Sequence, residues 1–211
     1  MERNKKYTEI KNIFGNNFIG IDEINDIDPK KQFISIDNIE YSNIPYSIEF
    51  LKDKCNDYIL FYFQPIIKNK LNFTINNLKS FFKSRKYSDV SFYNQDWYEK
   101  EKFANECAET PGWYLLKTSV IESSRGLMPE FINEKIKYPT ANLCIYLFFL
   151  NFTVNKTILW QHDYIWCSDL DSNGDNIYIG RYYDINKTSK DGFSIHRHLK
   201  LKSNYGSIDF Y

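Results

Sequence analysis

The chain has little glycine and none of the glycine-rich motifs that bind phosphate groups. It contains only 8 Gly among 211 residues. Neither GxxxxGK[ST] nor GxGxxG occurs, so the common nucleotide-binding loops are excluded. The GxSxG motif of serine hydrolases is also absent.

The chain also lacks an excess of charge of either sign. Lys plus Arg and Asp plus Glu each number 27, which gives a net charge of zero. Nucleic acid and anionic membranes therefore have no long-range attraction for the molecule as a whole. A local basic patch could form at the end of one predicted helix, although cations in a last turn also complement the helix dipole. The patch would comprise Lys79, Lys83, Arg85 and Lys86.

Long apolar runs and paired cysteines are missing too. The most apolar segment, Leu143–Leu150, is far shorter than the roughly 20 residues that cross a bilayer. The first ten residues contain no apolar stretch typical of a signal peptide. None of the four cysteines belongs to a CxxC pair, which favours a reducing compartment. We therefore expect a cytoplasmic protein with no membrane partner.

Aromatic residues are the most abundant unusual feature. The chain has 17 Phe, 17 Tyr and 4 Trp, or 18% of its residues. Codon bias in an AT-rich genome is the simpler cause, and an aromatic binding surface is the alternative. The apolar fraction of 43% is typical of a globular protein.

The hydrophobic pattern predicts a single α+β domain. Its centre should be a mainly antiparallel β-sheet, with a buried helix over residues 139–152 packed on it and other helices at the periphery. Residues 1–45 should form a helix and an arm on the body of residues 46–211. Periodicity, capping residues and turn signals predict helices at 5–14, after Ser47, after Thr74, at 96–107 and at 129–136, and strands at 33–39, 58–63, 113–120, 158–167, 177–183 and 193–199.

The predicted strand 158–167 carries large aromatic side chains at alternate positions. Trp160, Tyr164 and Trp166 would share one of its faces. If exposed, they could stack on bases or sugars. Aromatic rows of this kind are more often part of the core, and both interpretations stay open.

The turn after this strand resembles the first half of an EF-hand calcium loop. Oxygen-bearing side chains alternate before Gly174, and they belong to Asp169, Asp171, Asn173 and Asp175. The twelfth loop position should be Glu but is Gly180, and the flanks are predicted strands. A plain hairpin turn is the alternative, because Asn-Gly is a strong hairpin signal. A calcium ion would need a further carboxylate, from Asp163 or Asp184.

Two other patterns could carry chemistry. His196 and His198 lie two residues apart and could ligate zinc. Cys167 and His162 are possible further ligands, but strand alternation would place them on opposite faces of their own strand. The loop Ser123–Arg125 offers a nucleophile for a small hydrolase, if a histidine reaches it. Solvated histidines and a capping serine are the simpler interpretations.

Several segments resemble a family of uncharacterised proteins from host-associated bacteria. They are Tyr58–Pro65, Gly112–Val120, Ser124–Arg125, Tyr138–Ala141, Cys167–Asp169 and Ile179–Gly180. The resemblance covers roughly residues 58–195 and implies no activity, cofactor or site.

We expect a non-catalytic protein that binds another protein, because no convincing catalytic constellation accompanies the surplus of aromatic residues. A small hydrolase and a nucleic-acid-binding accessory protein are the alternatives.

Overall fold

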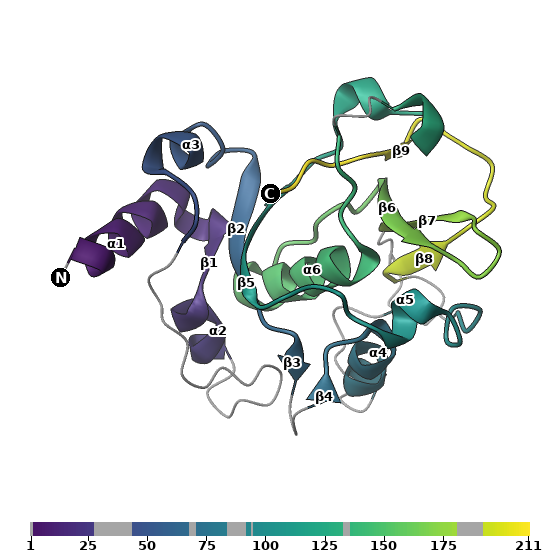
Figure 1. The fold of residues 1–211 in the computed structure, drawn as a ribbon, viewed down its shortest axis with the longest axis horizontal. Coiled ribbons are helices and arrows are strands. Elements are labelled where there is room, and N and C mark those ends of the chain that lie inside the picture. The colour runs from purple at the N-terminus through teal and green to yellow at the C-terminus, as the bar shows by residue number, and fades with distance from the viewer. Residues whose placement is uncertain are drawn as a thin grey trace.

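The helix α6 (Ala141–Asn155) lies at the centre of the molecule, between two β-sheets (Figure 1). The computed structural model describes residues 2–27, 44–67, 71–83, 92–93, 95–132, 136–180 and 192–211. α6 contacts β2 (Tyr58–Phe63) of one sheet and β6 (Tyr164–Leu170) and β7 (Asn176–Gly180) of the other. Because both sides of α6 pack on a sheet, its residues are apolar all round rather than along one stripe.

The first sheet contains three strands in the order β1-β2-β5. β1 (Phe18–Ile19) pairs parallel with β2, and β5 (Gly112–Lys117) pairs antiparallel with it. Every residue of β2 is buried, as its continuous apolar run predicts. The C-terminal tail continues this sheet, since backbone hydrogen bonds join Leu115 to Tyr211 and Lys117 to Asp209.

The second sheet contains four strands in the order β8-β7-β6-β9. β6, β7 and β8 (Ser194–His196) are antiparallel, whereas β9 (Tyr205–Gly206) pairs parallel with β6. One face of this sheet packs on α6 and belongs to the main core. The other face carries a second apolar cluster, formed by Ile132, Tyr164, Trp166, Tyr178 and Tyr205.

The remaining elements are peripheral. Helices α1 (Glu2–Phe14) and α2 (Ile21–Ile27) flank β1, and Ile10, Phe14 and Ile24 of these helices reach the main core. A short ribbon pairs β3 (Ile66–Ile67) with β4 (Leu71–Asn72). The other helices are α3 (Ile48–Lys52), α4 (Ile75–Lys83), α5 (Lys102–Asn105) and the one-turn helices η1 (Gly15–Asn17), η3 (Glu122–Ser124) and η4 (Pro129–Phe131).

The structure confirms the α+β class and the antiparallel majority, but divides the strands between two main sheets. Ser47 and Thr74 cap α3 and α4 as predicted. The helix predicted at 96–107 was wrong in extent: residues 97–100 form turns and only Lys102–Asn105 is helical. The Glu99 carboxylate, expected to cap that helix, binds Lys79 at 3.0 Å. The helix predicted at 129–136 is likewise shorter, and within the described residues it comprises only η4. The predicted strand 33–39 lies outside the described residues.

None of the helices within these described ranges is both long enough and apolar enough to cross a membrane.

Candidate functional site

The turn between β6 and β7 is organised by the carboxylate of Asp171. Its Oδ1 atom accepts the backbone N–H groups of Asn173, at 2.8 Å, and Asp175, at 2.9 Å. Gly174 adopts φ +84°, a left-handed conformation that favours glycine. The local sequence therefore folds into a tight turn in which an aspartate side chain satisfies backbone donors.

Asp171 also joins this turn to a distant part of the chain. Its side chain is fully buried, and its Oδ2 atom forms an ion pair with the guanidinium of Arg197. Arg197 in turn lies 4.5 Å from the centre of the Trp97 ring. Burial alone would raise the pKa of Asp171, but the N–H of Asp175, the Arg197 guanidinium and the N–H of Asn173 together lower it.

A second carboxylate clamps the same turn from segment 95–101. Glu101 accepts the backbone N–H of Ser172 at 2.8 Å and the Ser172 hydroxyl at 3.1 Å. The Glu101 carboxylate also lies 3.9 Å from the Arg197 guanidinium. The turn, segment 95–101 and the end of β8 are thus held together by charge-assisted contacts around Arg197.

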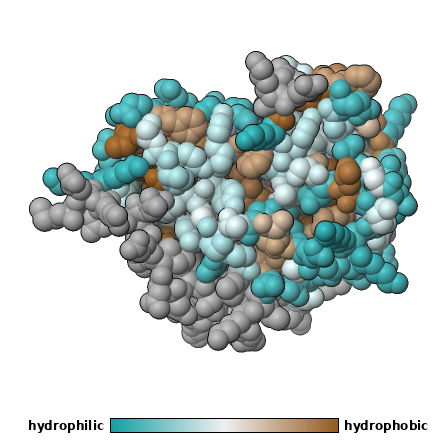
Figure 2. Space-filling view, in the orientation of Figure 1, coloured by the Kyte–Doolittle hydropathy of each residue, from teal (hydrophilic) through white to brown (hydrophobic). Residues whose placement is uncertain are grey.

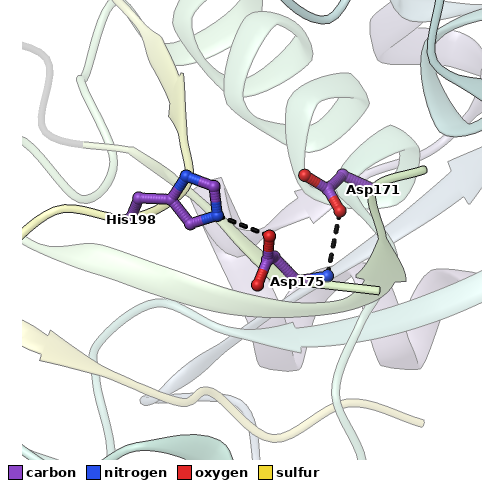
Figure 3. Close-up of side chains that lie close together, drawn as sticks. All are labelled: Asp171, Asp175 and His198. Atoms are coloured by element: carbon purple, nitrogen blue, oxygen red, sulfur yellow. Dashed lines mark hydrogen bonds and ion pairs between the residues drawn. The ribbon is translucent and has the colours of Figure 1, made fainter. Parts of the chain in front are cut away.

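His198 approaches the turn from its other side (Figure 3). Its Nε2 atom lies 2.5 Å from Oδ2 of Asp175. Ligand atoms of Asp171, Asp175 and His198 all lie within 4.8 Å of one another, and this is the group among the described residues that could hold a metal ion. We call it the turn cluster.

The turn cluster differs from the calcium set expected from the sequence. Asp171 and Asp175 are present, but Asp169 points to the start of α6, where its Oδ2 accepts the N–H of Ala141 at 2.7 Å. The pairing of β6 with β7 also shifts in register between Trp166 and Leu170, the stretch that contains Asp169. The Asp171 carboxylate already carries two N–H groups and a guanidinium, so Arg197 occupies the place at which a cation would bind.

Asp169 belongs to a polar group at the N-terminus of α6. Thr140 caps this helix by accepting the N–H of Leu143 at 3.2 Å, and its hydroxyl also contacts the Glu109 carboxylate. Burial raises the pKa of Asp169, the N–H of Ala141 opposes that effect, and nearby Glu109 adds to the rise. Burial and the Glu109 carboxylate raise the pKa of the Cys107 thiol to about 12, so this cysteine is a poor nucleophile at neutral pH.

The aromatic residues expected on strand 158–167 are buried. Tyr164 and Trp166 lie in the second cluster, with 4% and 3% of their surface exposed. Trp160 packs in the main core, ahead of β6, and has φ 50°. The predicted strand was therefore too long: α6 continues to Asn155, Lys156 ends it in a left-handed conformation, and the chain turns before Tyr164. These three side chains offer no exposed stacking surface.

The loop proposed for a hydrolase is built into the fold. The Ser124 hydroxyl is fully buried, donates to the carbonyl of Ile121 at 2.6 Å and accepts the N–H of Ser207 at 2.9 Å. Arg125 binds both carboxylate oxygens of Asp163, at 2.8 and 3.1 Å. The ion pair ties the loop to Asp163, the residue that follows His162.

The paired histidines predicted as zinc ligands contact different groups. A ring nitrogen of His196 lies 3.1 Å from the Gln95 amide, whereas His198 contacts Asp175. β8 ends at His196, and His198 adopts φ 62°, so the expected strand alternation stops between them. The group of possible metal ligands among the described residues includes His198 but not Cys167, which is buried beside Cys144.

The predicted basic patch is not assembled at Lys79. This lysine is 5% exposed and binds Glu99, with its ammonium 4.8 Å from the Tyr98 ring centre. Arg85 and Lys86 lie outside the described residues, and nothing is described of the side chain of Lys83.

Three large apolar side chains in the second half of the chain are exposed, and no signal in the sequence predicted their exposure. Phe131 is 71% exposed on η4, whose neighbour Ile132 belongs to that cluster. Leu170, 52% exposed, ends β6, and Leu199, 46% exposed, follows β8 and donates its N–H to the Tyr178 hydroxyl at 2.7 Å. We call these three residues the outer apolar rim. Figure 2 shows hydrophobic colour at the upper right, where Figure 1 places the short helical turns after β5.

No family model, curated protein or solved structure matches this chain. The family resemblance drawn from its sequence therefore stays a prediction.

Proposed function

We propose that this chain is a non-catalytic, cytoplasmic protein that binds a protein partner through a surface centred on Phe131 of the outer apolar rim. The exposure of Phe131 is the observation that carries the proposal. An aromatic side chain with 71% of its surface in water gains free energy when a partner covers it. Exposed aromatic residues of this kind are typical anchors of protein interfaces.

The hydrogen-bonded backbone that carries Phe131 supports this role. The backbone of η4 is closed by hydrogen bonds from Phe131 to Met128 and from Ile132 to Pro129. The carbonyl of Leu127, two residues before η4, accepts the indole N–H of the buried Trp166 at 3.0 Å. Phe131 is thus presented by a segment anchored on the second cluster, and binding would cost little ordering of the backbone.

The non-catalytic part of the proposal rests on how candidate nucleophiles are used. The Ser124 hydroxyl is buried between backbone groups, and the Cys107 thiol has a strongly raised pKa. Zero net charge and the buried Lys79 favour a protein partner over nucleic acid. The four free thiols support a reducing cytoplasm.

Site-specific photo-cross-linking tests the proposal. A photoreactive phenylalanine analogue replaces Phe131 in one variant and Tyr211 in a matched control. Tyr211 is also an exposed aromatic residue, at 41%, but its ring packs on Phe50 of α3 and its backbone pairs with Leu115 of the first sheet. We expect a discrete protein adduct from position 131 and none from position 211 in extracts of the cell that makes the protein. Equal labelling at both positions, or adducts to nucleic acid, would contradict the proposal.

A further inference from the structure

We draw no further inference here: the strongest candidate, the turn cluster formed by Asp171 and Asp175 of the β6–β7 turn and His198 after β8, belongs to the site already described, its buried carboxylate is already paired with Arg197, and no second observation among the described residues points to a bound cation.

Discussion

The carboxylate of Asp171 connects the β6–β7 turn to a distant segment, although the sequence around it resembles a calcium loop. Its two oxygens bind two backbone N–H groups of its own turn and the guanidinium of Arg197, 26 residues further along the chain. A carboxylate with these partners is stabilised in its ionised form. The alternating oxygen-bearing side chains that predict a calcium site are therefore equally compatible with hydrogen bonds and ion pairs within the protein.

Replacing Asp171 tests that role. Asp171→Asn should lower the free energy of unfolding by about 2 kcal/mol at pH 7, because a hydrogen-bonded charge loses its partner. The folded-state pKa of Asp171 is lowered, so its contribution is present above the unfolded pKa of about 3.9 and is lost as pH falls through the folded pKa. Urea unfolding of wild type and Asp171→Asn at pH 3 to 7 measures this contribution to the free energy of unfolding. A difference between variant and wild type that stays constant down to pH 3 would contradict the assignment.

Asp169 should respond to pH in the opposite direction. Its folded-state pKa is raised, so its contribution to stability is present at low pH and is lost as pH rises through that pKa. Asp169→Asn keeps an oxygen for the N–H of Ala141 and should raise the melting temperature at pH 7. Asp169→Ala, the control, removes the acceptor and should lower it. Thermal unfolding at pH 4 and pH 7 separates the variants. A lower melting temperature of Asp169→Asn than of wild type at pH 7 would refute the prediction.

At the scale of elements, α6 connects the two sheets. Tyr146 faces the first sheet, where its hydroxyl donates to the carbonyl of Tyr62 at 3.2 Å. Phe148 faces the second, with its ring centre 4.2 Å from that of Phe193. The helix therefore belongs to both halves of the core, and the halves should unfold together.

Truncating either side of α6 tests this coupling. Tyr146→Ala and Phe148→Ala should each reduce the free energy of unfolding by about 3–5 kcal/mol, as is usual for large buried aromatic residues. Each variant should still show a single transition when circular dichroism and intrinsic fluorescence are compared. Two separate transitions in either variant would mean that the sheets are independent.

The cap of α6 gives a smaller and more local effect. Thr140→Ala should destabilise the protein by about 1 kcal/mol, because the N–H of Leu143 loses its acceptor. Thr140→Ser retains the hydroxyl and is the matched control. Urea unfolding compares the two, and an equal loss in both variants would show that the hydroxyl is not the stabilising group.

Elements with strong local signals could be predicted from the sequence. α6 and β2 are long apolar segments with caps or clear ends, so their type follows from composition and periodicity. The 158–167 strand was overestimated because alternation continues through residues that turn. In contrast, the Asp171–Arg197 pair and the exposure of Phe131 depend on tertiary packing between distant segments, for which the sequence carries no local signal.

At the scale of the whole molecule, the turn cluster predicts the response to metal ions. Because Arg197 already neutralises Asp171, millimolar calcium should change the melting temperature by less than about 1 °C relative to a chelator. Zinc and calcium are tested in parallel by thermal unfolding. A calcium-specific rise that is lost in Asp171→Asn would overturn this expectation and make the turn a calcium site.

The proposed interface at Phe131 makes a prediction about Tyr211. Phe131 lies next to Ile132 of the second cluster, whereas the backbone of Tyr211 pairs with Leu115 of the first sheet. An interface centred on Phe131 should therefore tolerate changes at Tyr211.

The dissociation constant of the cross-linked partner, measured for wild type, Phe131→Ser and Tyr211→Ser, tests the proposed interface most directly. Phe131→Ser should weaken binding roughly 30-fold, which corresponds to the loss of about 2 kcal/mol at an interface anchor. Tyr211→Ser should leave the constant within about twofold, and all three proteins should retain the same circular dichroism spectrum. Unchanged binding by Phe131→Ser would contradict the outer apolar rim as the binding surface.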